Sequence, residues 1–163
     1  MTDLKHAHLL TMQLTVDYAG IKVIGQTPAG LRRIAPVTGG TFSGKRLSGT
    51  VLGGADWVLN RADAVMLIDV RLTLETDDGA LIYLAYQGRF LAEPEVMARF
   101  AKGALLQPHE FSLAMVAKLE CGDPRYAWLN NVIAVGTGEQ TPTGPIYTLP
   151  TSTSTPFSAA MLP

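Results

Sequence analysis

The charged residues of this 163-residue chain could support acid–base chemistry on a small molecule. Candidates for the acid, the base and a cation are Asp56, Arg61, Asp69, Arg71 and Glu120. A carboxylate buried beside an arginine has a shifted pKa and can move protons on a bound molecule. If these side chains point inward, Asp69 or Glu120 would transfer the proton. Arg71 or Arg61 would then stabilise an enolate-like charge. The alternative is that Asp69 and Arg71 form a solvated cross-strand pair that contributes little energy.

His8 is a further candidate for catalysis. It lies on the apolar face of the first predicted strand, together with Leu10 and Met12. A buried imidazole there could act as a general base or as a hydrogen-bond donor. The alternative is a core histidine whose hydrogen bonds are satisfied within the fold.

Metal and cofactor chemistry has little support in the sequence. His6 lies two residues before His8, so a metal site completed by Glu120, His109 or Cys121 is conceivable. This spacing is common by chance and the chain has a single cysteine, so we expect no metal. The chain also lacks a phosphate-binding loop, a dinucleotide-binding glycine motif and a nucleophile elbow, so we expect no cofactor.

Aromatic side chains could line a cavity for a small molecule, because ligand pockets combine apolar walls with a few polar groups. The candidate ligand-binding residues are the aromatic Trp57, Tyr83, Tyr86, Tyr126 and Trp128 and the polar Asp56, Arg61 and Asn130. Ordinary core packing explains the aromatic residues equally well. Asn130 falls in a predicted strand, where asparagine is unfavourable, so we expect it or Asn131 to make a specific hydrogen bond.

Alternation of apolar and polar residues predicts β-strands through most of the chain. The alternation is clearest in 64–75, where every second residue from Ala64 to Leu74 is apolar. This strand ends at Asp78-Gly79, which is typical of tight hairpins, and a second strand should return over 80–89. Both faces of the returning strand are apolar, which predicts that a helix or a neighbouring subunit covers its outer face.

A closed antiparallel β-barrel of about eight to ten strands with one short helix is the fold that these patterns favour, because closure removes exposed strand edges. Further strands are predicted over 8–17, 31–36, 46–52, 111–121, 129–135 and 146–149. The helix is predicted over Pro94–Lys102, with proline at its first position and Gly103 after its end. A barrel of this size can hold one small ligand.

Composition indicates one folded domain, which we expect over residues 1–150, with a flexible loop at 38–44 and a flexible tail at 151–163. The net charge is −1 and hydrophobic residues make up 47% of the chain, so neither a nucleic-acid partner nor disorder of the body is expected. The longest apolar run, 80–86, is too short to cross a membrane as a helix. With no secretion signal and a single cysteine, we expect a cytoplasmic location.

Several motifs resemble one known family. They are Gly40-Thr41-Phe42-Ser43-Gly44, Leu47-Ser48-Gly49, Gly53-Gly54-Ala55-Asp56-Trp57, Arg61, Asp69 with Arg71, Leu74 to Ile82, Pro94-Glu95, Pro124 to Asn130 and Val135-Gly136. In this order they resemble the bacterial and fungal family called domain of unknown function 3237. The resemblance implies a compact antiparallel β-barrel that often forms oligomers, and it implies no assigned reaction. Many members have an arginine where this chain has Leu113, so an anion-binding role of that position is not carried over.

We therefore expect a barrel that encloses a small apolar molecule, which could be aromatic, polyketide-like or terpenoid-like. The first hypothesis is a cofactor-free isomerase, cyclase or lyase that acts by proton transfer. The alternatives are a non-catalytic carrier or sensor, or an oligomeric structural barrel with a filled interior. In each case we expect a homo-oligomer, a dimer or tetramer, and neither a nucleic-acid nor a membrane partner.

Overall fold

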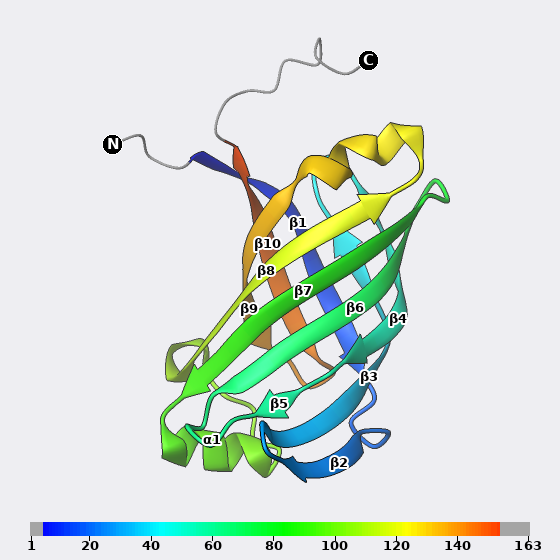
Figure 1. Cartoon of the computed structure of the whole chain (residues 1–163). Coiled ribbons are helices and arrows are strands. Elements are labelled where there is room, and N and C mark those ends of the chain that lie inside the picture. Colours follow the sequence, from blue (N-terminus) through cyan, green and yellow to red (C-terminus); the bar gives the residue numbers. More distant parts are fainter. Residues whose placement is uncertain (1–4, 154–163) are drawn as a thin grey trace.

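The computed structural model describes residues 5–153, in which ten strands form one antiparallel sheet. Eight strands make the barrel wall: β1 (Lys5–Val16), β3 (Gly30–Ser43), β4 (Ser48–Asp56), β6 (Met66–Thr76), β7 (Leu81–Ala92), β8 (Phe111–Cys121), β9 (Ile133–Gln140) and β10 (Pro145–Thr153). Neighbours follow in the order β1, β10, β9, β8, β7, β6, β4 and β3, and β3 pairs back onto β1 (Figure 1). Two short strands, β2 (Lys22–Thr27) and β5 (Leu59–Asn60), extend this wall. The predicted closed antiparallel barrel is confirmed.

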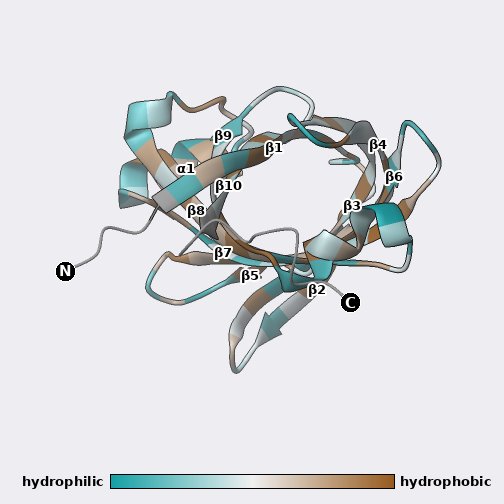
Figure 2. Cartoon of the chain, turned by 90° about the horizontal axis from the view of Figure 1, so that it is seen from above, coloured by the Kyte–Doolittle hydropathy of each residue, from teal (hydrophilic) through white to brown (hydrophobic). Residues whose placement is uncertain are grey.

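Alternation along the strands separates the inside of the barrel from the outside. In β6 and β8 every second side chain is buried, and the residues between them are more exposed. The inward side chains join into one apolar core. Seen along its axis, the chain forms a ring of strands (Figure 2), so the sheet encloses an interior that its own side chains shield from water.

Short helices lie at the two ends of the barrel (Figure 1). The α-helix α1 (Pro94–Ala101) begins with proline and is followed by Gly103, as predicted. Its apolar residues Met97 and Phe100 pack against the core. The 3₁₀ helix η1 (Pro108–Glu110) precedes β8, and the 3₁₀ helix η2 (Pro124–Asn131) lies at the end opposite α1. No helix in the described residues is long and apolar enough to span a membrane.

The prediction of a flexible loop at 38–44 is wrong, because residues 38–43 form the last part of strand β3. This part of β3 pairs with β1 on one side and with β4 on the other. Its glycines serve close packing, since a Cβ added at Gly40 would lie 2.1 Å from the carbonyl oxygen of Gln13. A glycine-rich segment can therefore be a closely paired strand, although its composition is also typical of a loop.

Other boundaries also differ from the predictions. Residues 129–131 of the strand predicted over 129–135 belong to η2, which begins where Asp123 accepts a hydrogen bond from the backbone N–H of Arg125 (2.9 Å). Trp128 and Asn130 are thus helical. Strand β2 was not predicted, because its side chains are mostly exposed and do not alternate. Of the tail predicted over 151–163, residues 151–153 belong to β10 and the remainder lies outside the described residues.

His8 lies on the outside of the barrel, which contradicts its predicted place in the core. The pairing of β1 with β10 shifts register between His8 and Leu10. This irregularity buries both Leu9 and Leu10, so the alternation changes phase and His8 is exposed. Its Nε2 lies 3.0 Å from the hydroxyl of Thr11. The position does not suit a buried general base.

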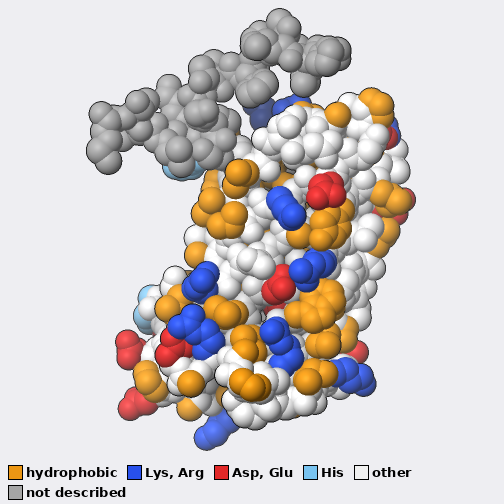
Figure 3. All heavy atoms as spheres, viewed as in Figure 1, with side chains coloured by type: hydrophobic (Ala, Val, Ile, Leu, Met, Phe, Trp, Pro, Cys, Tyr) orange, Lys and Arg blue, Asp and Glu red, His pale blue; other side chains and the backbone are white. Residues whose placement is uncertain are grey.

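The outer face of β7, β8 and β9 exposes several apolar side chains. These are Leu81, Tyr83, Val116, Ile133 and Val135. The cross-strand register places Lys118 and Glu120 among them, and Figure 3 shows apolar side chains mixed with charged ones on this side of the barrel. Leu81 and Tyr83 on the outer face of β7 are exposed among residues 5–153, and the homo-oligomer stays a prediction.

The close approach of β3 and β1 predicts that Gly40→Ala destabilises the fold. The new methyl group would meet a backbone carbonyl at a residue whose φ is +147°, so we expect the free energy of unfolding to fall by about 2 kcal/mol or more. Urea denaturation measures the change. Gly122→Ala is the matched control, because nothing lies within 4 Å of the added Cβ there. Equal stability of the two variants would contradict the packing described for β3.

Candidate functional site

The barrel interior is filled at one end and hollow at the other. Near η2 the core is closed by fully buried side chains, among them Leu74, Ile82 and Leu129. At the α1 end a cavity of about 560 Å³ opens among the inward side chains of the strands. Its wall is largely apolar and includes Met97 and Phe100 of α1. A cavity of this size and polarity can hold one small organic molecule.

A β-bulge in β4 turns Asp56 into this cavity. The pairing of β4 with β6 shifts register between Val51 and Gly53, so the inward positions change from odd to even residue numbers. Asp56 thereby lies opposite two inward residues, Ala35 of β3 and Val70 of β6. A regular strand would have pointed its side chain outward.

The environment of Asp56 favours the protonated carboxyl. Burial raises the pKa of Asp56 to about 7, and the charge of Asp69 adds to the effect. A hydrogen bond from the backbone N–H of Asp69 (3.0 Å to Oδ1) and the charges of Arg33 and Arg32 act in the opposite direction. Because the pKa is close to neutral, Asp56 can both accept and return a proton at physiological pH.

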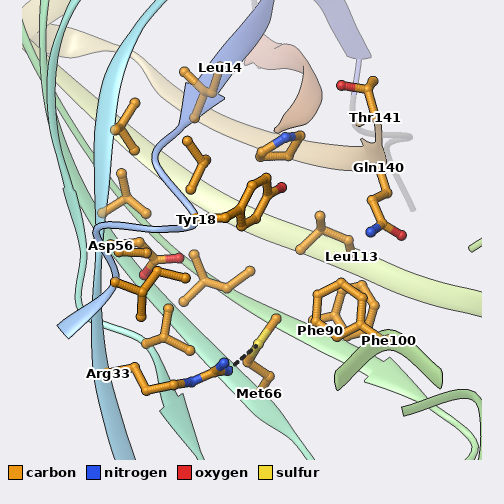
Figure 4. A pocket seen from close by; sticks show the side chains of 18 of the residues that line it. Leu14, Tyr18, Arg33, Asp56, Met66, Phe90, Phe100, Leu113, Gln140 and Thr141 are labelled. Atoms are coloured by element: carbon orange, nitrogen blue, oxygen red, sulfur yellow. Dashed lines mark hydrogen bonds between the residues drawn. The ribbon is translucent and has the colours of Figure 1, made fainter. Parts of the chain in front are cut away.

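Arg33 brings a positive charge into the same cavity. Its Nη2 donates a hydrogen bond to Oδ1 of Asn60 (2.6 Å) and lies 3.7 Å from Sδ of Met66. Its Nε is buried and has no hydrogen-bond partner within residues 5–153. The ion pairs found among these residues do not include Arg33. Figure 4 shows Arg33 and Asp56 on one side of the cavity and Phe90 and Phe100 across from them.

Two buried tyrosines complete the polar lining. The rings of Tyr86 and Tyr147 meet edge to face, with centroids 5.1 Å apart. Burial raises the pKa of both phenols, and the charge of Asp56 raises each further. Both phenols therefore keep their protons at neutral pH and can donate hydrogen bonds to a ligand. Tyr18 also lines the cavity, and burial raises its pKa.

These groups suit proton transfer on an enclosed ligand. The cavity combines a carboxyl that titrates near neutral pH, a guanidinium and two phenolic donors with apolar walls. In such a weakly polar interior, interactions with a developing charge are stronger than in water. No three side chains of His, Cys, Asp or Glu within the described residues gather in a way that could hold a metal ion.

Of the candidates named from the sequence, Asp56 and Tyr86 line the cavity, whereas Asp69 and Arg71 do not. Asp69 and Arg71 occupy the outward positions of β6, between the buried Ile68, Val70 and Leu72. Their side chains form an ion pair of 3.3 Å and are 34% and 46% exposed. The alternative of a solvated ion pair between Asp69 and Arg71 is therefore correct, except that both residues belong to the same strand and not to two strands. Asp69 contributes to the site through its backbone N–H and its charge.

The remaining candidates also lie outside the cavity. Glu120 and Tyr83 are cross-strand partners on the outer face, where both are exposed. Arg61 pairs with Asp63, and Trp57 lies beneath the guanidinium of Arg71 (5.0 Å). Two further residues support the η2 end of the barrel. Trp128 stacks with Arg46 (3.8 Å), and Asn130 holds the backbone N–H and carbonyl of Cys121 through two hydrogen bonds of 2.9 Å.

Sequence reasoning missed Arg33, Asn60, Tyr18 and Tyr147. Alternation alone places Arg33 on one face with Ala35 and Val37, but it does not tell which face points inward. Tyr147 lies in a short predicted strand with no charged neighbour to draw attention to it. A search for lone charges within apolar strand faces would have found Arg33.

Fold and site together define a closed β-barrel with a ligand-sized cavity that holds a buried carboxyl. The chain matches the family described as "Protein of unknown function (DUF3237)" over residues 4–150, and it belongs to this family. The resemblance drawn from the sequence motifs is thus confirmed.

Relatives of known structure or name agree with this assignment. A β-barrel-like protein of Acinetobacter baumannii has a TM-score of 0.81 and 35% identity, covering 94% of this chain and 98% of its own. A UPF0311 protein of Rhodopseudomonas palustris is 30% identical over 124 residues, which is 76% of this chain and 81% of that protein. A hydroalkoxylation enzyme of Penicillium herquei is 28% identical over 115 residues, which is 71% of this chain and 62% of that enzyme.

The raised pKa of Asp56 predicts how stability depends on pH. Between about pH 4 and pH 7 the carboxyl is protonated in the folded protein but ionised in the unfolded chain. The stability that this proton contributes is therefore complete below about pH 4 and is lost as the pH rises through 7. Asp56→Asn removes this loss. Between pH 5 and pH 8, the wild type should lose about 2 kcal/mol relative to Asp56→Asn.

Urea denaturation at both pH values measures this difference. Glu120→Gln is the control, because its exposed carboxyl lies on the outer face. Parallel stability curves for the wild type and Asp56→Asn would contradict a carboxyl that titrates near pH 7.

Proposed function

We propose that this barrel is a cofactor-free isomerase or cyclase that moves a proton on a small, mainly apolar molecule in its cavity. The observation that supports the proposal most directly is the Asp56 carboxyl, whose pKa burial raises to about 7 inside an apolar cavity. A carboxyl of this kind accepts and returns protons efficiently at neutral pH. The cavity also argues against the alternative of a purely structural barrel, which requires a filled interior.

In this proposal the proton transfer predicted for Asp69, Glu120 or His8 is carried out by residues that line the cavity. The Asp56 carboxylate would accept a proton from one atom of the ligand, and the resulting carboxylic acid would return it to another. Product and substrate then have the same composition. Tyr86 and Tyr147 can donate hydrogen bonds to an oxygen on which negative charge develops. The closed wall and α1 limit competition from water.

The fungal relative supports this type of reaction. Hydroalkoxylation adds an O–H group across a carbon–carbon double bond, so one C–O and one C–H bond form while the O–H bond and the π bond are lost. When both groups belong to one molecule, the reaction closes a ring and needs only the transfer of a proton. This is the chemistry that a buried carboxyl in an apolar cavity can promote without a cofactor.

The proposal predicts isomerisation that depends on Asp56. Purified protein would be incubated with a metabolite extract of its native host in H₂O and in D₂O, and the products identified by mass spectrometry. We expect one compound to be replaced by an isomer of equal mass, which carries one deuterium at carbon when formed in D₂O. Asp56→Asn should slow this conversion by about 100-fold or more.

Asp69→Asn is the matched control, because it changes a carboxyl on the neighbouring strand that faces outward and keeps the backbone N–H to Asp56. It should convert the compound at a rate close to that of the wild type, because the charge of Asp69 affects the pKa of Asp56 less than burial and the retained backbone hydrogen bond do. A compound that is retained and released unchanged by all three proteins would contradict catalysis and indicate a carrier. Equal loss of activity in Asp69→Asn would contradict the assignment to Asp56.

A further inference from the structure

Arg33 carries a positive charge that no carboxylate of residues 5–153 contacts in an ion pair. Its Nη2 contacts a neutral amide and a thioether, those of Asn60 and Met66. Its Nε is the only buried side-chain nitrogen or oxygen without a hydrogen-bond partner that is found within residues 5–153. A buried donor without a partner costs about 1 to 3 kcal/mol, and more when it is charged. Because the Arg33 side chain also lines the cavity, a ligand that brings an anionic acceptor to its guanidinium would offset this cost.

Asp56 does not compensate this charge through a direct contact. Arg33 and Asp56 lie on adjacent strands, with Asp56 opposite Ala35, two residues along from Arg33. The two side chains influence each other electrostatically, yet no ion pair within 4.0 Å joins them. When Asp56 is protonated, the charge of Arg33 is therefore left without a carboxylate in contact; Glu139, the other carboxylate that lines the cavity, is an exposed residue.

The opposite side of the cavity suits a flat apolar group. Phe90 stacks on Phe100 of α1 and on Phe111 of β8, with centroids 4.9 Å apart in both pairs. Phe90 and Phe100 line the cavity, and Figure 4 places them across from Arg33 and Asp56. Stacked rings of this kind favour planar, unsaturated ligands over branched aliphatic ones. The cavity therefore has a cationic side and an aromatic side.

We infer that the ligand is a planar apolar molecule with one oxyanion, a carboxylate, phenolate or enolate, which accepts a hydrogen bond from the guanidinium of Arg33 where it lines the cavity. This inference rests on the proposed function for its site and names the class of substrate. The oxyanion would be fixed by Arg33, and the apolar body would extend toward Phe90. Asp56 would then face the part of the ligand between these two contacts, where a proton could be moved.

Binding of two probes of nearly equal shape tests the inference. The probes are 2-naphthoate, which is an anion above pH 5, and its neutral methyl ester, and isothermal titration calorimetry at pH 6 measures both. The wild type should bind 2-naphthoate at least about tenfold more tightly than the ester, as a charge-assisted hydrogen bond in a buried site predicts. Equal affinity for the two probes, or no binding of 2-naphthoate at millimolar concentration, would overturn the inference without the need for any variant.

Arg33→Met should remove this preference and weaken 2-naphthoate binding about tenfold, with less than about threefold change for the ester. Arg32→Met is the matched control, because the neighbouring arginine donates its hydrogen bond to the carbonyl of Trp57. It should keep the preference of the wild type. Circular dichroism would verify that both variants are folded, and unchanged binding of 2-naphthoate by folded Arg33→Met would overturn the inference.

The pH dependence separates this inference from the proposed function. Besides burial, the groups that act on the pKa of Asp56 are Asp69 of β6 and Arg33 and Arg32 of β3. The charge of Asp56 in turn raises the pKa of Tyr86 of β7 and Tyr147 of β10. Ionisation of Asp56 between pH 6 and pH 8 should weaken 2-naphthoate binding about fivefold, and Asp56→Asn should abolish this change. An oxyanion preference without isomerisation would contradict only the proposed function, whereas isomerisation without the preference would contradict only the class of substrate.

Discussion

Pairing between β1 and β3 closes the sheet, and this closure creates the environment on which the site depends. Every wall strand then has a hydrogen-bonded neighbour on both sides, and the inward side chains are withdrawn from water. A carboxyl placed there loses its hydration, and burial is the largest cause of the raised pKa of Asp56. In an open sheet the same residue would be an ordinary ionised aspartate. The chemistry of the cavity is thus a consequence of the fold.

The two ends of the barrel divide stability and function between them. Leucine and isoleucine side chains fill the η2 end, where Asn130 fixes the backbone of Cys121 and the core has no exposed surface. The α1 end holds the cavity and the polar groups that packing alone would not favour. The buried Nε of Arg33, a donor without a partner in the described residues, lowers stability, and the filled end of the same barrel offsets this cost. Such a division is common where a scaffold positions a strained or polar site.

Much of the fold follows from the sequence, because alternation is a direct record of which side chains face the core. It predicts the bounds of β8 to the residue and those of β6 and β7 to within three residues. It failed where one residue changed the phase, as at the irregularity beside His8 and at the bulge before Asp56. For this reason the sequence favours Asp69, which stands out on a regular strand, for the proton transfer, whereas the bulge turns Asp56 inward. For Arg33, alternation gives the face that it shares with Ala35 and Val37, but whether this face points inward is set by the neighbouring strands across the sheet.

The central claim is that the Asp56 carboxyl, although buried in the cavity, titrates near neutral pH. Nuclear magnetic resonance of protein labelled with ¹³C at the aspartate carboxyl carbons, recorded between pH 3 and pH 9, measures this directly. Comparison with Asp56→Asn assigns the signal. The structure predicts one aspartate signal that titrates with a midpoint near 7 and is missing in Asp56→Asn. If every aspartate signal titrates at or below about pH 4, the buried carboxyl is ionised throughout and the account of proton transfer is wrong.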